Sequence, residues 1–470
     1  MLSKSLSTAR PLKAARSQPA PAQPVAPPPQ VPRAVSNLRT RGAENDVLRK
    51  IGCVLALITV FVRFTGIHEW IATYFGDTYI LYLLVPPALL AMLASGGARR
   101  TLQWNLARYW LGFAAWLILG IPFSSYKMGS LLRVWGYLRT EFVMLFLIAG
   151  LLLTFTDLQR LMRVMFYAAL VDVFMARFLQ SDELRTRLEL FTGTMSNAND
   201  FAAQLVLMLP FLLIPLLSRK RNLLLCAFSL LGLGYGLYLI LRTGSRGAML
   251  SLVALALVCF WRASAGWKIT FSVLLPVAMI GLGLLLPPET VHRLMTLEDT
   301  DAPAYDPVSR EAAESLDARK FVLQESLWLT ITHPVFGVGS GEFMDAEASV
   351  AREKGRRGSW HETHNTYTQV SSEAGIPAFI FFAGALVSSF LLLRRLWLRS
   401  RNQPSNERND MLRVAVIALS LSLLGFCVAI FFLSLAYRFY LPAMGGIIIS
   451  VARVADQEWR QPPAPARSMA

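Results

Sequence analysis

The sequence predicts an all-α, polytopic integral membrane protein. Of its 470 residues, 54% are hydrophobic and only 16% are charged, whereas a soluble domain carries about a quarter charged residues. Apolar runs long enough to cross a bilayer replace the missing charge. The net charge of +16 fits cytoplasmic loops rich in Lys and Arg, and no recognition module for nucleic acid is visible.

The chain begins with a tail, residues 1–45, that is rich in Pro, Ala, Ser and Arg. Such a composition buries no core, so we expect the tail to be disordered. Its basic residues predict that it stays in the cytoplasm.

About twelve apolar segments of spanning length follow. Nine lie within residues 46–287 and three within 366–455, before a short cytoplasmic tail, 456–470. With both termini inside, most basic loops face the cytoplasm, as the positive-inside rule requires. The segments are 50–65, 76–96, 107–123, 139–155, 161–179, 200–217, 222–241, 247–262, 268–287, 366–393, 411–434 and 438–454. The arginines predicted on the outer side are exceptions to this rule: Arg133, Arg139, Arg177, Arg185, Arg187, Arg242, Arg246, Arg319 and Arg438.

One outer loop is long, spanning residues 288–365. It opens with acidic residues and continues into a predicted amphipathic helix, Ser315 to Thr332, which His333-Pro334 stops. Glycine turns at 337–341 follow. A loop of this length between spans is usually functional or disordered, and the helix and glycine turns favour function.

Two arginines, Arg242 and Arg246, bracket a short outer turn between two spans. Arg246 begins the next helix, where a guanidinium and the positive helix end can both bind phosphate oxygens. The alternative is that the pair anchors the protein to lipid headgroups. A third outer arginine, Arg319, lies on the predicted loop helix, where a solvated arginine is the ordinary interpretation.

Asn197 and Asn199 stand where an outer segment joins a span. They could cap the helix that follows, or their amides could help to hold a phosphate or a sugar.

His364 and Asn365 lie at the border between the long loop and an apolar span. A neutral imidazole there can accept a proton from a sugar hydroxyl; the alternative is a histidine hydrogen-bonded at the bilayer interface. The spacing of His361 and His364 does not suit a helical zinc motif, which needs an i, i+4 pair. Asp299 and Asp301 could bind a divalent ion, although such a pair more often forms a turn. Phosphate-loop and dinucleotide motifs are absent, and we expect neither a metal nor a cofactor.

The combination of motifs resembles the O-antigen ligase and polymerase superfamily over roughly residues 50–455. The motifs are Ser245 to Leu250, His333 to Gly339, and His364-Asn365 followed by Gly375. The resemblance implies a GT-C-like fold in the bacterial inner membrane with a site facing the periplasm. The implied donor is a glycan on a polyprenyl diphosphate, moved without a metal to a hydroxyl acceptor such as a lipid A-core sugar.

By the same resemblance, the family's functional arginines fall on Arg246 and Arg319, and its His-Asn pair falls on His364 and Asn365. We expect the diphosphate to lie between Arg246 and Arg319 with Arg242 nearby. His364 would take the acceptor's proton, and attack opposite the leaving group would invert the anomeric centre. Asn365 or Glu373 could orient the imidazole.

Both ligases and polymerases of the superfamily share these motifs, and Ala378 departs from the Gly, Thr or Tyr of many ligases. The alternatives are therefore a polymerase on the lipid carrier, a transferase to protein hydroxyls, and a polysaccharide transporter. Against transport, no repeat relates the two halves of the chain.

Overall fold

The computed structural model describes residues 33–76, 79–179, 188–190, 193–288, 290–291 and 307–459. The chain divides into two units, residues 1–44 and 45–470. Of the first unit, the described residues are helical. Throughout the described ranges the chain forms helices and connecting segments with no strand, which confirms the all-α prediction.

The helices, in chain order, are α1 (Arg33–Thr65), α2 (Ile67–Phe75), α3 (Ile80–Ala94), α4 (Gly97–Leu102), α5 (Asn105–Gly120), η1 (Ile121–Phe123), α6 (Lys127–Gly136), η2 (Tyr137–Phe142), α7 (Val143–Leu151), α8 (Phe155–Leu179), α9 (Ala198–Met208), η3 (Leu209–Leu212), α10 (Leu213–Leu217), α11 (Leu223–Arg242), α12 (Arg246–Arg262), α13 (Ala265–Leu284), α15 (Pro307–Thr332), α16 (Phe343–Glu353), α17 (Thr366–Arg401), α18 (Glu407–Ala429), η4 (Ile430–Phe432) and α19 (Tyr440–Glu458).

Six helical segments in the described part of the chain are long and apolar enough to cross a membrane. A seventh span is possible if α1 and α2, which meet at 72°, form one broken span. All twelve predicted segments overlap helices, but the count of twelve spans stays a prediction. The six segments are Asn105–Phe123, Lys127–Leu151, Ala198–Leu217, Leu223–Arg242, Thr366–Arg401 and Glu407–Phe432.

The structure differs from the predicted N-terminal tail over residues 33–45, which begin α1. No proline follows Pro32 until Pro86, so every backbone N–H of this stretch is available to a helix. Residues 1–32, residues 292–306 of the predicted outer loop and residues 460–470 of the predicted C-terminal tail lie outside the described residues. The predicted loop helix lies within α15, which ends at Thr332, directly before His333.

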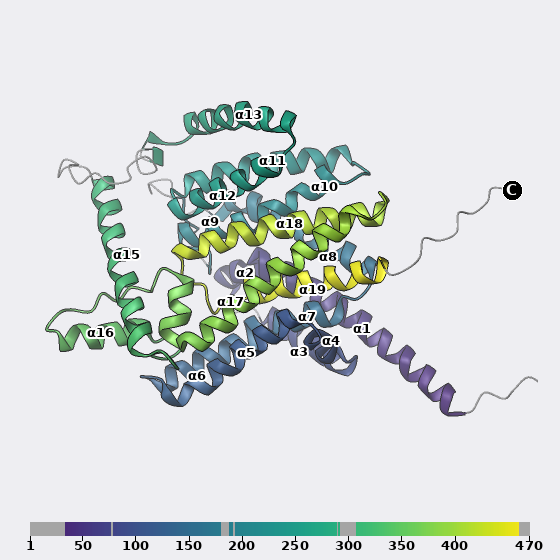
Figure 1. The fold of residues 1–470 in the computed structure, drawn as a ribbon, viewed down its shortest axis with the longest axis horizontal. Helices are drawn as coiled ribbons and strands as arrows, with labels where there is room; N and C mark the ends of the chain where they lie inside the picture. Colours follow the sequence, from purple (N-terminus) through teal and green to yellow (C-terminus); the bar gives the residue numbers. More distant parts are fainter. Residues whose placement is uncertain are drawn as a thin grey trace, which may run out of the picture. The chain divides into compact units, whose positions relative to one another are not determined.

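Helices α5 and α17 pack along one another, and α17 also contacts α18 and α19 (Figure 1). At the α5–α17 contact, the rings of Trp110, Phe113 and Phe382 lie edge-on or tilted with centroids 5.7–5.9 Å apart. The opposite faces of these helices expose Leu119 and Ile380. Exposed apolar faces of this kind fit helices whose solvent is lipid.

Helix α17 is broken at Gly375, whose φ of 84° and ψ of 173° are not helical. Pro377 supplies no N–H, so carbonyl groups before the break lose their helical partners. Val338 donates its N–H to the Ser372 carbonyl and Gly339 to the Glu373 carbonyl, each at 2.9 Å. The glycine turn that follows α15 therefore hydrogen-bonds to the carbonyl groups that the break leaves free.

Two further bonds hold the same junction. The Ile376 N–H donates to the Pro334 carbonyl at 2.8 Å. The indole N–H of Trp116, on α5, donates to the Ala374 carbonyl at 3.2 Å. The loop after α15, the kinked span and α5 are thus joined at one point.

We predict that Gly375→Ala destabilises the protein by about 1–3 kcal/mol, because its φ strains any L side chain. An added Cβ would also collide with the backbone of Val335. The matched control is Gly234→Ala in α11, where a Cβ meets nothing within 4 Å. Thermal unfolding of the purified protein in detergent checks this, and equal melting temperatures for the two variants would contradict it.

Candidate active site

His364 lies two residues before α17, at the end of a loop that the segment between η4 and α19 holds in place. Its φ of 49° is in the left-handed region, uncommon for a residue with a side chain. The His364 N–H donates to the Ser434 hydroxyl at 2.9 Å. That hydroxyl also lies 3.0 Å from the Thr363 hydroxyl. Ser434 therefore fixes the backbone that carries the imidazole.

The first turn of α17 is tied to the same connecting segment. The Thr366 hydroxyl donates to the Leu433 carbonyl at 2.6 Å and accepts from the Leu435 N–H at 3.0 Å. The Gln369 side-chain oxygen accepts from the Ala436 N–H at 3.1 Å. These bonds join the segment between α18 and α19 to the helix that follows the histidine.

Asn365 is buried and caps α17. Its side-chain oxygen accepts from the N–H groups of Tyr367, at 2.9 Å, and Thr368, at 3.2 Å. This is the usual way to satisfy the free N–H groups of a first turn. These contacts show that Asn365 stabilises the start of α17. That it binds the donor or orients the imidazole of His364 stays a prediction.

Glu373 is a buried carboxylate beneath the glycine turn. It accepts the Gly341 N–H at 2.7 Å. A Cβ added to Gly341 would lie 2.7 Å from Nε of Arg133, so only glycine leaves room for this arginine. Glu373 and Gly341 together place Arg133 beside the turn.

A cavity of about 560 Å³ opens at this end of the helices. Its walls come from α6, η2, the glycine turn, the loop before His364 and residues 434–438. Two cationic side chains, Arg133 and Arg438, line it together with four acidic ones, Glu141, Glu342, Asp345 and Glu362. Burial and the nearby Asp345 raise the pKa of Glu342, although Arg133 opposes them. The cavity is therefore polar and carries charges of both signs, with acidic groups in excess.

The imidazole of His364 is itself partly buried, and its pKa is lowered to about 4. The causes are burial, then the positive charge of Arg319, then His361. Arg319, on α15, is thus brought within electrostatic range of His364, although the two are far apart in sequence. The imidazole is neutral at pH 7, the form that accepts a proton.

Arg246 is the first residue of α12, whose N-cap Ser245 accepts from the Ala248 N–H at 3.5 Å. A Cβ on Gly247 would lie 2.8 Å from the Phe432 ring, so this turn packs directly on η4. Because η4 leads into Ser434, Arg246 belongs to the same end of the molecule as His364. Arg242 ends α11, and its carbonyl accepts the Leu188 N–H at 3.1 Å.

Asn197 caps α9 by accepting the Asn199 N–H at 2.8 Å, which confirms the capping interpretation for Asn197. The next residue, Asp200, lies within electrostatic range of the cavity residues Arg438 and Glu362. The start of α9 therefore borders the cavity, and a ligand-holding part for the two asparagines stays a prediction.

The sequence predicts a pocket that holds His364, Arg246 and Arg319, and this convergence stays a prediction. Among the described residues, the cavity lining does not include His364, Arg246 or Arg319. Arg133 and Arg438 could be singled out from the sequence, because both are exceptions to the positive-inside rule. Nothing in the sequence pointed to Ser434, since a serine after an apolar run is common.

The described residues contain no group of three or more His, Cys, Asp and Glu side chains that could hold a metal ion. Asp299 and Asp301, the alternative metal pair, lie outside those residues, as do Arg185 and Arg187.

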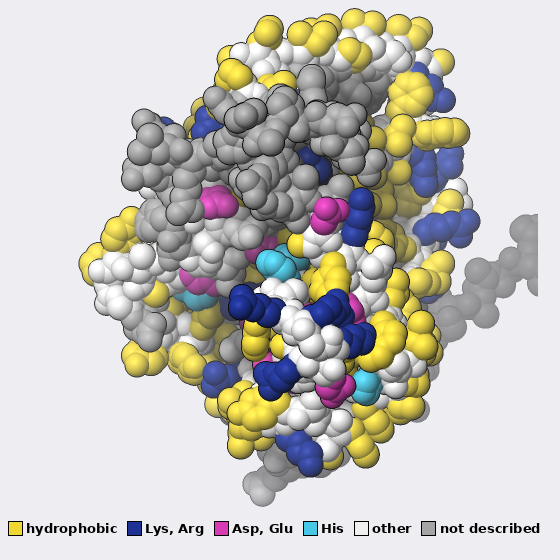
Figure 2. Space-filling view, turned by 90° about the vertical axis from the view of Figure 1, so that its left-hand side faces the viewer, with side chains coloured by type: hydrophobic (Ala, Val, Ile, Leu, Met, Phe, Trp, Pro, Cys, Tyr) yellow, Lys and Arg dark blue, Asp and Glu magenta, His cyan; other side chains and the backbone are white. Residues whose placement is uncertain are grey.

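A basic rim is formed by the end of α16 and the segment that follows it. Lys and Arg side chains gather there with His side chains among them (Figure 2). The exposed cations Arg352, Lys354, Arg356 and Arg357 close the α16 segment. Arg356 pairs with Glu325 of α15 at 3.3 Å, which holds the rim against the loop helix.

A family model matches part of the chain. The family model described as O-antigen ligase matches residues 231–383, the stretch from α11 through the kink of α17. It includes Arg242, Arg246, Arg319, His364 and Gly375. No curated protein matches the chain. The family match supports glycan transfer of the ligase or polymerase type.

We predict that His364 keeps reacting with diethyl pyrocarbonate as the pH falls from 7 to 5. Only the neutral imidazole reacts, and a pKa of about 4 keeps it neutral over this range. Mass spectrometry of the modified peptide measures the midpoint. Arg319→Gln removes a positive charge and should move the midpoint upward.

A midpoint near 6.5, the ordinary histidine value, would contradict the buried placement of His364. A midpoint that Arg319→Gln leaves unchanged would contradict the electrostatic link between the loop helix and the histidine.

Proposed function

We propose that this chain, a member of the O-antigen ligase superfamily through residues 231–383, moves a glycan from a polyprenyl diphosphate to a hydroxyl acceptor. The acceptor we favour is a sugar of the lipid A core. The reaction takes place at the periplasmic face of the bacterial inner membrane, with both termini in the cytoplasm. A polymerase that extends the glycan on its carrier is the alternative, because the family match covers both activities.

One juxtaposition supports this proposal: Arg319 of α15 lies within electrostatic range of the imidazole of His364. A base and a cation within electrostatic range are what transfer from a diphosphate requires. The cation stabilises the departing anion, while the base takes the acceptor's proton. The cavity beside Ser434 supplies space for a polar substrate.

The donor diphosphate would bind between Arg246 and Arg319, with Arg242 nearby. Arg246 adds the positive end of α12 to its own charge, since it is that helix's first residue. Negative charge grows on the diphosphate as the bond to the anomeric carbon breaks. Removing one preorganised donor from such a site typically costs 10²–10³ in rate.

His364 would accept the proton as the acceptor oxygen attacks the anomeric carbon. Its low pKa keeps the ring neutral but makes it a weak base. A diphosphate bound at Arg319 offsets the positive charge that contributes to this low pKa. Donor binding would therefore raise the basicity of His364 toward the working pH. Attack opposite the leaving diphosphate inverts the anomeric centre.

We predict that His364→Ala lowers glycan transfer by about 10²–10⁴, the usual contribution of a general base. The matched control is His361→Ala, which removes an exposed imidazole three residues away. Transfer of lipid-linked glycan is measured in membranes with equal amounts of each variant. Full activity of His364→Ala would reject the proposed base.

We predict that Arg246→Ala and Arg319→Ala each lower transfer by about 10²–10³, because each removes a charge that stabilises the leaving diphosphate. Arg352→Ala, on the exposed end of α16, serves as the control for removal of an arginine from the same face. Wild-type transfer by both site variants would reject the diphosphate-binding role.

A deletion strain separates the two family activities. Its lipopolysaccharide is examined by gel electrophoresis. Unmodified core together with accumulated lipid-linked polymer identifies a ligase, whereas core that bears single repeats identifies a polymerase. Treatment with EDTA tests the metal-independent reaction separately: activity lost and then restored by a divalent ion would contradict it.

A further inference from the structure

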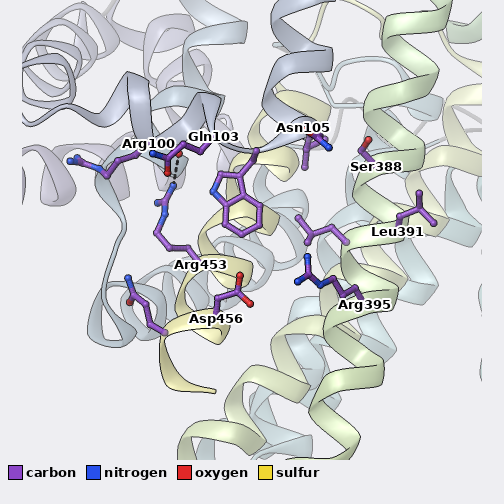
Figure 3. A pocket seen from close by; sticks show the side chains of 12 residues that line it. Arg100, Gln103, Asn105, Ser388, Leu391, Arg395, Arg453 and Asp456 are labelled. Carbon is purple, nitrogen blue, oxygen red and sulfur yellow. Dashed lines mark hydrogen bonds between the residues drawn. The ribbon is translucent and has the colours of Figure 1, made fainter. Parts of the chain in front are cut away.

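A second cavity, of about 740 Å³, lies at the opposite ends of α5, α17 and α19 from His364. Figure 3 shows that its side chains come from α4 and the start of α5, the later turns of α17 and the last turns of α19. Three arginines line it: Arg100, Arg395 and Arg453. The predicted glycan chemistry uses none of them.

Arg100 and Arg453 direct their guanidinium groups at the C-terminal end of α7. Arg100 donates to the Gly150 carbonyl at 2.9 Å, and Arg453 donates to the Ala149 carbonyl at 2.5 Å. Arg453 also donates to the carbonyl of Arg100, at 3.3 Å. Neither forms an ion pair with a carboxylate within the part of the chain that the structure describes.

The carbonyls at the helix ends that Arg100 and Arg453 contact cannot fully balance these charges. A helix C-terminus carries roughly half of a negative elementary charge, whereas the two guanidinium groups carry two positive charges. Arg100 also donates to the Ser95 carbonyl at the end of α3, so with both helix ends counted about one positive charge remains. Capping of α7 and α3 therefore explains the positions of Arg100 and Arg453 but leaves part of their charge uncompensated.

Arg395 adds a third positive charge from α17. It is exposed and has no ion pair among the described residues. Asp456, the acidic residue of the lining, points toward it in Figure 3 but forms its ion pair with Arg399 instead. The cavity thus keeps a clear excess of positive charge.

One wall of the cavity, on α17, is apolar beside Arg395. Leu391 on α17 is 59% exposed, and Leu392 and Leu106 line the cavity beside it. These leucines lie on helices that are long and apolar enough to cross a membrane. A ligand here therefore meets cations and an exposed apolar side chain next to one another.

We propose that this cavity binds the phosphate group of an anionic glycerophospholipid, with Arg395 and Arg453 on the phosphate and an acyl chain along Leu391. Basic pockets between membrane helices are suited to such headgroups. A soluble phosphate would satisfy the same cations, but it would leave the apolar wall without a partner. The lipid site is separate from the glycan transfer proposed above and does not depend on it.

The test is native mass spectrometry of the full chain, purified in detergent and titrated with dioleoyl phosphatidylglycerol. Arg395→Gln should weaken lipid binding about tenfold, since hydrogen bonds to charged groups have this strength. The matched control is Arg394→Gln, which removes the neighbouring exposed arginine that does not line the cavity. Because Arg395 is exposed, its replacement leaves the packing of the helices intact.

Weaker binding by Arg395→Gln alone supports the site, and equal binding by the two variants overturns it. Inorganic phosphate in about 100-fold excess separates the two possible sources. Retention of the lipid supports a headgroup site, whereas displacement assigns the cavity to soluble phosphate and overturns the lipid proposal.

Discussion

The break in α17 at Gly375 is the constraint on which the rest of this end of the molecule depends. A helix that loses hydrogen bonds in or beside a bilayer must satisfy its carbonyl groups elsewhere, because water is scarce there. Here the N–H groups of Val338 and Gly339 take two of those carbonyls. A defect in the span thus becomes the attachment point of the loop that carries Arg319.

A second attachment lies at the other end of the same short stretch. The segment after η4 holds the turn of Thr366 and the backbone of His364 through Ser434. The helix that begins with Arg246 packs on η4 through Gly247. Elements from the middle and the end of the chain therefore fix the histidine and its surroundings jointly.

Much of this arrangement was predictable from the sequence, because its causes are local. Apolar length predicts the helices, and His333-Pro334 predicts the end of α15. Arginines that break the charge rule, such as Arg133 and Arg438, indicate the polar end. The cavity was not predictable, because it depends on which loops meet. The part of Ser434 was not predictable for the same reason, because its hydroxyl acts through its contact with the backbone of His364. The number of spans does not follow from apolar length alone, since α3 and α12 are shorter than a typical membrane-spanning helix.

The two attachments have a consequence for engineering this protein. Exchange of the stretch from α11 to α17 with that of a relative would look like a clean way to change substrate preference, because this stretch coincides with the matched domain. Yet the backbone of His364 is hydrogen-bonded to Ser434, which lies outside that stretch. The turn at Arg246 packs on Phe432, which also lies outside it. A working chimaera must therefore carry the connection between α18 and α19 from the same parent as the histidine.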